Sequence, residues 1–234
     1  ESVANAADYD GSAIVIDSCV GDGYEGDINI YINNATLESA IGYTLIEVGN
    51  SDEETRLTAL DIAGGSFKGA QDIDILVRPV AENKVQISGG TFNTDVDKYC
   101  MIGHRTIYNE NDKTYEVVFM DETNSVAKIS RPTGETIFCK TLQGAIDMAV
   151  NGDIITLLND IATDEIILVN KSVTIDGDSH TVASTANRIL WVDESNVDVN
   201  LKNIEFVSTT AERGVQVNLN KTDVKLNIDN CVIP

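Results

Sequence analysis

One aromatic residue has neighbours that could hold a sugar. Trp191 is the single tryptophan of the chain, and Arg188, Asp193 and Glu194 lie close to it in the sequence. An indole ring offers a flat π face to the C–H groups of a sugar, and polar neighbours supply hydrogen bonds at its edge. These four residues are therefore the candidate ligand contacts. The alternative is that Trp191 packs under a loop or against another part of the chain, which is the commoner position of tryptophan.

Other residues capable of catalysis or metal binding are spread along the chain. His104 and His180 fall in different halves, which argues against a shared metal site or a catalytic triad. The acidic run SDEE at 51–54 lacks EF-hand spacing, so we interpret it as a solvated loop, with weak calcium binding as the alternative. GDGYEG at 21–26 has the spacing of a dinucleotide loop, but a strand-like segment follows it where a helix is required. We predict no catalytic residue, no cofactor and no metal ligand.

The charge balance limits the partners. The chain has 38 Asp and Glu against 16 Lys and Arg, a net charge of −22. Such a surface repels phosphate backbones and anionic lipids, so neither nucleic acid nor direct membrane insertion is expected. No apolar run approaches the roughly 20 residues of a membrane helix, and ESVANAADYD at 1–10 does not resemble a signal peptide. We expect an extracellular or cell-surface protein whose signal and anchor lie outside this sequence.

The four cysteines show neither CxxC nor zinc-site spacing. We interpret them as small buried apolar residues. The alternative is a disulfide framework, in which Cys100 and Cys139 are the first pair to test.

Three copies of one pattern recur in the N-terminal half. They are INNATL at 32–37, IAGGSF at 62–67 and ISGGTF at 87–92. Each copy has inward apolar residues at period two, a short polar or glycine turn, and another inward bulky residue. Glycine suits a sharp bend between strands because it reaches backbone conformations that other residues avoid. Three stacked columns are predicted: Ile30, Leu60 and Val85; Ile32, Ile62 and Ile87; and Leu37, Phe67 and Phe92.

A second set of copies fills the C-terminal third. SVTIDGDSHTV at 172–182, NVDVNLKNIEF at 196–206 and DVKLNIDNCVI at 223–233 align without a gap. The preceding strands also align, so that Leu190 and Val192 match Val217 and Leu219 and point inward. The predicted columns are Val173, Val197 and Val224; Ile175, Val199 and Leu226; Val182, Phe206 and Ile233; and His180, Ile204 and Cys231. In this alignment Ile189 and Trp191 point outward, beside Gln216 and Asn218.

Repeats of roughly 20–30 residues, built from strands that return in the same phase, indicate stacked parallel coils. We predict an all-β fold, a right-handed parallel β-helix in two blocks. Residues 1–120 would be the last coils and closing segment of a first β-helix. Residues 121–234 would be a hairpin and the first coils of a second. Between them TLQGAIDMAVNGD predicts an amphipathic helix over 141–151, with Thr141 as its N-cap, that covers the open end of the second β-helix.

The segment from 136 to 182, FCKTLQGAIDMAVNGDIITLLNDIATDEIILVNKSVTIDGDSHTV with its flanks, resembles β-helix domains in large secreted surface proteins of gut-type bacteria. ISGGTFNTDVDKYCMIG, with NDKTYEVV, resembles the segment that closes such a helix. The family belongs to the wider pectate-lyase-like fold group, which includes lyases, glycosidases and non-enzymatic adhesins. The resemblance implies the end of one β-helix followed by the start of another, and it implies no reaction. Our hypothesis is a non-catalytic stalk or adhesin-like module, with a neutral glycan or a host or bacterial surface protein as its partner. The alternative is a polysaccharide lyase or glycoside hydrolase, because a carboxylate pair from different coils leaves no linear motif.

Overall fold

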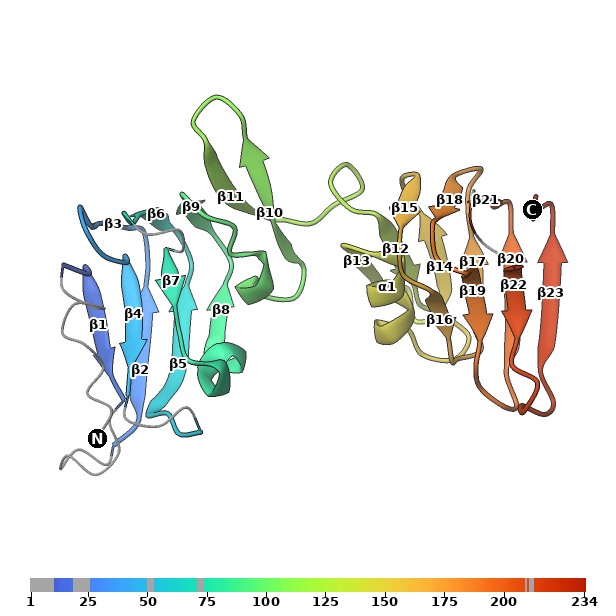
Figure 1. Ribbon diagram of the computed structural model, residues 1–234, viewed down its shortest axis with the longest axis horizontal. Coiled ribbons are helices and arrows are strands. Elements are labelled where there is room, and N and C mark those ends of the chain that lie inside the picture. The colour runs from blue at the N-terminus through green and yellow to red at the C-terminus, as the bar shows by residue number, and fades with distance from the viewer. Residues whose placement is uncertain (1–10, 19–25, 50–52, 71–73, 209, 211–212) are drawn as a thin grey trace. The chain divides into compact units, whose positions relative to one another are not determined.

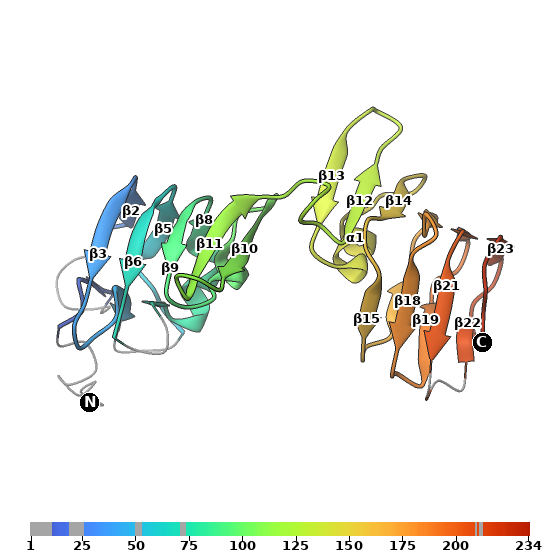
Figure 2. The same cartoon turned by 90° about the horizontal axis from the view of Figure 1, so that it is seen from above.

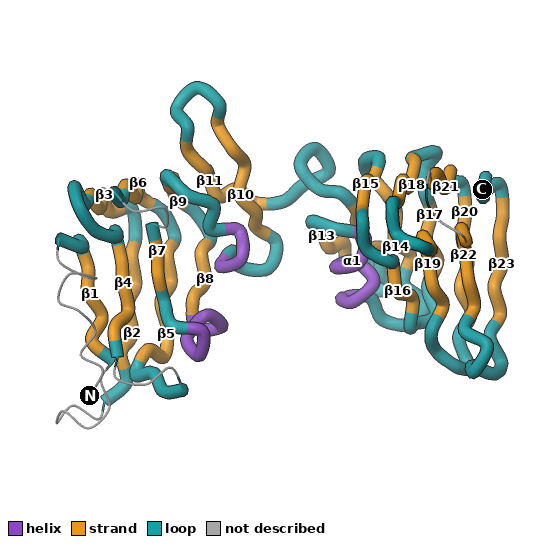
Figure 3. Tube along the Cα trace, viewed as in Figure 1, coloured by secondary structure: helices purple, strands orange, loops and turns teal. Residues whose placement is uncertain are grey.

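A computed structural model of the chain describes residues 11–18, 26–49, 53–70, 74–208, 210 and 213–234. It shows a parallel β-solenoid divided into two compact units, Glu1–Phe119 and Met120–Pro234 (Figure 1). In each unit, short strands joined by turns stack into three sheets, so the predicted parallel coils are confirmed (Figure 3). No helix of the described part of the chain is long and apolar enough to span a membrane.

In unit 1, each of three sheets is built from one strand of every coil. The sheets are β1-β4-β7, β2-β5-β8 and β3-β6-β9, and the last is extended by the antiparallel hairpin β10–β11. Two 3-10 helices, η1 (Pro79–Lys84) and η2 (Asp97–Tyr99), lie beside the last coil. The strand bounds are β1 (Ile14–Asp17), β2 (Ile28–Ile32), β3 (Ala35–Glu38), β4 (Leu45–Val48), β5 (Leu57–Ile62), β6 (Gly65–Lys68), β7 (Ile75–Leu76), β8 (Val85–Ile87), β9 (Gly90–Phe92), β10 (His104–Asn109) and β11 (Thr114–Phe119).

The register of unit 1 confirms all three predicted columns. Phe67 and Phe92 stack with ring centroids 4.5 Å apart and planes only 10° from parallel. The glycine turn has the predicted role, because Gly65 has a φ of +123° and a Cβ there would lie 2.1 Å from the carbonyl oxygen of Ala35. The aromatic column continues into the closing hairpin, where Tyr115 pairs with Phe92 and Tyr108 pairs with Tyr115.

Unit 2 has the same three-sided plan, and its sheets are named here by the first strand of the solenoid in each. The β14 sheet has the order β13-β12-β14-β17-β20-β23 and the β16 sheet β16-β19-β22. The β15 sheet has the order β15-β18-β21 (Figure 2). The bounds are β12 (Ala127–Ser130), β13 (Thr136–Cys139), β14 (Ile154–Leu157), β15 (Ile161–Thr163), β16 (Ile167–Val169), β17 (Thr174–Asp176), β18 (Thr181–Ser184), β19 (Arg188–Val192), β20 (Asp198–Lys202), β21 (Glu205–Ser208), β22 (Arg213–Val217) and β23 (Lys225–Asp229).

The predicted register of unit 2 is partly wrong. Val199 pairs with Leu226 and Val182 pairs with Phe206 as predicted, but Ile175 pairs with Leu201 rather than Val199. The ungapped alignment is therefore two residues out of register at β17, the strand of the first copy. The cause is the turn after β17, which is two residues longer than its counterpart after β20 and contains two residues with positive φ, Asp178 at 48° and Ser179 at 74°. The two-residue slip leaves the inward and outward phase unchanged, because side chains alternate with period two.

Helix α1 (Leu142–Met148) begins where predicted and ends before Asn151. The hydroxyl of Thr141 accepts a hydrogen bond from the N–H of Gly144 at 2.9 Å, which confirms the N-cap. Leu142, Ile146 and Ala149 are buried in the core of unit 2, as expected for a helix that covers the first coil. The helix stops early because Ala149 already has an extended backbone, with ψ at 153°.

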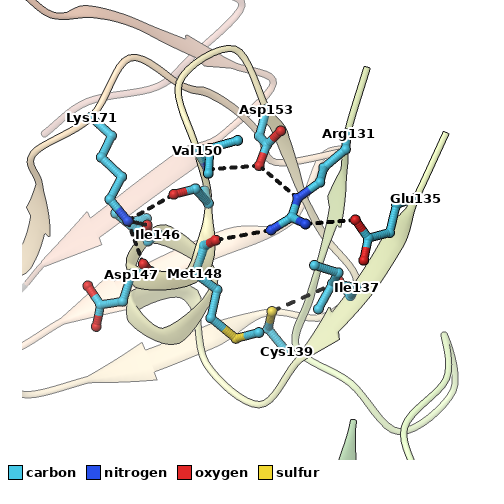
Figure 4. Close-up of polar contacts among 11 residues, drawn as sticks. Arg131, Glu135, Ile137, Cys139, Ile146, Asp147, Met148, Val150, Asp153 and Lys171 are labelled. Carbon is cyan, nitrogen blue, oxygen red and sulfur yellow. Dashed lines mark hydrogen bonds and ion pairs between the residues drawn. The ribbon is translucent and has the colours of Figure 1, made fainter. Parts of the chain in front are cut away.

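Two basic side chains bind the carbonyl groups at the end of α1 (Figure 4). The Nζ of Lys171 donates to the carbonyl oxygens of Ile146 at 3.0 Å, of Asp147, and of Ala149 at 2.9 Å. A guanidinium nitrogen of Arg131 lies 3.4 Å from the carbonyl oxygen of Met148. These carbonyls have no partner within the helix, so cations at this end satisfy them and also interact favourably with the helix dipole.

Candidate functional site

Trp191 lies on the outer face of the β16 sheet, between two inward residues of β19. Leu190 and Val192 are fully buried, as predicted, and Trp191 is half-buried. The guanidinium carbon of Arg188 lies 4.7 Å from the centroid of the indole ring, which occupies one face of the ring with a cation–π contact. Trp191 and Arg188, two of the four predicted contact residues, therefore lie together. They contact each other, so Arg188 already occupies one face of the ring.

The other two predicted residues belong to the turn that follows β19. The carboxylate of Asp193 accepts a hydrogen bond from the Asn218 side chain, and that of Glu194 accepts one from the N–H of Ser195 at 2.8 Å. The predicted alignment of this strand with the next coil is wrong by two residues. Leu190 pairs with Val215 and Val192 with Val217, so Trp191 lies beside Gln216 rather than Asn218. Leu219, predicted to point inward, is 93% exposed, and Ile189, predicted to point outward, is fully buried in the core.

The structure places a cavity of about 330 Å³ between the cap of unit 2 and the free edge of β15. We call it the head pocket. Its apolar lining comes from the helix, the hairpin and the first coil, and polar groups surround it. The lining residues are Val126, Lys140, Thr141, Leu142, Gln143, Asp160, Ile161, Ala162, Thr163, Glu165, Ile166 and Ile167.

A shallower groove of about 240 Å³ continues from the head pocket across the outer face of the β15 sheet. Ala162 and Thr163 line both hollows. Along the groove Ala162 pairs with Ala183, and Ala183 pairs with Val207, so small apolar side chains form its floor over three successive coils. Hydroxyl groups accompany them, and none of the described residues that line the groove is charged. These residues are Ala162, Thr163, Ala183, Ser184, Thr185, Val207 and Ser208.

The head pocket gathers charged residues that the sequence did not connect. Lys140, Asp160 and Glu165 come from three different segments, and the imidazole of His180 lies 3.2 Å from the carboxylate of Asp160. Hydrogen bonds from the N–H of Thr181 and from His180 lower the pKa of Asp160. Asp160 therefore stays ionised at neutral pH and does not suit a general acid, which needs a raised pKa. An alignment of the coil at 154–163 with its successor would have placed Asp160 beside Thr181.

The remaining sequence candidates lie elsewhere. His180 takes its predicted position in the column, beside Ile204. The N–H of Glu205 donates a hydrogen bond to the carbonyl oxygen of His180, and the next residue, Thr181, pairs with Glu205. Cys139 is a free thiol in the core of unit 2, as the interpretation of the cysteines as buried apolar residues predicts, and burial raises the pKa of this thiol to about 11. Most of GDGYEG and half of SDEE lie outside the described residues. Within the residues that are described, no group of three or more potential ligands could hold a metal ion.

Comparison of the chain with protein-family models, curated proteins and solved structures gives no match. The fold and the geometry of the two hollows therefore carry the functional argument.

Proposed function

We propose that the chain is a non-catalytic segment of an extracellular or cell-surface β-helix protein, and that it binds a neutral glycan along the groove of the β15 sheet. The other coils would act as a rigid stalk that presents this face. The observation that carries the proposal is the uncharged lining of the groove on a chain with a net charge of −22. A sugar chain offers C–H faces to small apolar side chains and hydroxyl groups to Thr and Ser.

The shape of the groove supports an elongated ligand. It crosses three strands, and neighbouring strands lie about 4.8 Å apart, so a ligand along the solenoid axis meets one small apolar residue and one hydroxyl residue at every coil. The resemblance of residues 136–182 to surface β-helix domains supports the proposed location. Trp191 lies on the neighbouring β16 sheet and would be a secondary contact.

A glycan array followed by calorimetric titration of the best glycan tests the proposal. Ala183→Arg places a long charged side chain in the middle of the groove, and we expect it to weaken binding by roughly tenfold or more, because a charge that enters a desolvated contact is costly. Thr174→Arg, an outward position on the β14 sheet, is the matched control and should bind as the native chain does. An array without any bound glycan, or equal affinity of both variants, would overturn the proposal.

A further inference from the structure

The first coil of unit 2 consists of β14, β15 and β16, and one edge of each strand faces the elements that cap this end, hairpin β12–β13 and helix α1. Two of these three edges are covered. On the β14 sheet, β12 pairs with β14 as an antiparallel strand. On the β16 sheet, the side-chain amide of Gln143 replaces a strand: its oxygen accepts from the N–H of Leu168 at 2.8 Å, and its nitrogen donates to the carbonyl oxygen of Leu168 at 3.2 Å. Both covers satisfy backbone groups that would otherwise be unpaired.

The third edge, that of β15, faces the head pocket instead. Within the described residues β15 has one strand neighbour, β18, on the side away from the cap. The carbonyl oxygen of Thr163 points to that side, because it accepts from the N–H of Thr185 at 3.1 Å. Successive residues of a strand direct their backbone groups to opposite sides. The N–H and carbonyl of Ala162 therefore point toward the head pocket, as those of Leu168 point toward Gln143.

The core is also incomplete at this edge. Ile161 is the inward residue of β15 and lies in the same column as Val182 and Phe206. Val182 is fully buried and Phe206 is 2% exposed, whereas Ile161 is only partly buried. The solenoid thus lacks one strand and one inward side chain at the place where the structure has a cavity of about 330 Å³.

We propose that the head pocket binds an extended peptide segment of another protein, which adds to the edge of β15 as a further strand. Its backbone would pair with the N–H and carbonyl of Ala162, and one apolar side chain would stack on Ile161. Strand addition of this kind takes its affinity from main-chain hydrogen bonds and its specificity from alternate side chains. Asp160 and Glu165 outnumber Lys140 at the pocket, so the peptide carries a basic residue beside its apolar one.

This inference does not rest on the glycan groove, although Ala162 and Thr163 line both hollows, and its test uses peptide ligands in place of glycans. A phage-displayed library of random short peptides is selected on the immobilised chain, and the enriched peptides are synthesised and titrated. Ala162→Pro removes the N–H that faces the pocket, and an edge strand tolerates proline when that N–H is not bonded within the sheet. Ala162→Ser, the matched control, keeps the N–H and the small side chain. We expect Ala162→Pro to weaken peptide binding roughly tenfold or more, and Ala162→Ser to leave it unchanged.

A second measurement does not depend on the folding of any variant. Each enriched peptide is made in two forms. One form carries N-methyl groups on the odd-numbered amides, and the other carries them on the even-numbered amides. A peptide bound as a strand directs one set of amides at β15 and the other set away from it. Methylation of the first set should therefore abolish binding, and methylation of the second set should leave the affinity unchanged. Equal effects of the two sets, equal binding to both variants at position 162, or no enrichment over the empty support would each overturn the proposal.

Discussion

The ammonium group of Lys171 lies 3.0 Å from the carbonyl oxygen of Ile146, and so joins the turn before β17 to the last turn of α1. We expect Lys171→Met to lower the free energy of unfolding by about 1–3 kcal/mol, because it leaves the carbonyls at the helix end without their charged donor. Lys202→Met, at an exposed position of β20, should have little effect. Urea unfolding followed by far-UV circular dichroism measures both, and equal stability of the two variants would show that Lys171 does not hold the cap.

The stacked pair in the core of unit 1 gives a second prediction. Phe92 is fully buried against Phe67, so Phe92→Ala should cost about 3–5 kcal/mol, as large-to-small core substitutions of phenylalanine do. Tyr31 is 64% exposed on β2, and Tyr31→Ala is the aromatic control. Thermal unfolding compares the two, and a Phe92→Ala protein as stable as Tyr31→Ala would contradict the column assignment.

The buried thiol of Cys139 predicts a stability loss in alkaline solution. Its pKa in the folded chain is raised to about 11 from an ordinary value of 9.0. Between these values the unfolded chain loses the proton while the folded chain keeps it, so this stabilising contribution is complete below pH 9 and is lost as the pH rises toward 11. The loss should be smaller in Cys139→Ala. Urea midpoints measured across this range would contradict the prediction if the two proteins showed the same slope.

A polysaccharide-degrading enzyme remains the alternative function, and Asp160 is the residue with which to test it. Its lowered pKa disfavours the general-acid role that a glycosidase requires. Together with the proposed binding function, this leads us to expect reducing-sugar and unsaturated-product assays on neutral and acidic polysaccharides to stay at background. Asp160→Asn should then give the same result as the native chain. Reproducible turnover that this substitution abolishes would make the enzyme the first interpretation.

Trp191 can be compared directly with the groove. Arg188 already covers one face of its ring, so Trp191→Ala should weaken binding of the array glycan less than Ala183→Arg does. Because Trp191 is the single tryptophan, its fluorescence also reports a ligand on the β16 sheet. A strong emission change on glycan binding, together with a larger loss in Trp191→Ala, would move the site to that sheet.

The sequence predicted most of the fold and little of the site. In unit 1 the glycine copies fixed the register, because a turn of constant length keeps Phe67 and Phe92 in phase. In unit 2 the ungapped alignment hid the longer turn at Asp178, so the register of β17 was wrong by two residues, whereas Val199 with Leu226 and Val182 with Phe206 were paired correctly. The head pocket had no sequence signal, because it arises from a strand that is missing beside Ala162 rather than from a motif. The position of Ile189 was missed because strict alternation fails near the corner where β19 begins.

The turn at Asp178 and Ser179 has a consequence for how such a chain can change in length. Two additional residues are accommodated there in left-handed conformations, while the strands on either side stay paired with the next coil. Each coil depends only on its immediate neighbours, so an insertion at this corner disturbs no distant contact. The corner is therefore a natural place for insertions to accumulate during evolution, and a suitable position at which to graft a foreign loop onto the solenoid.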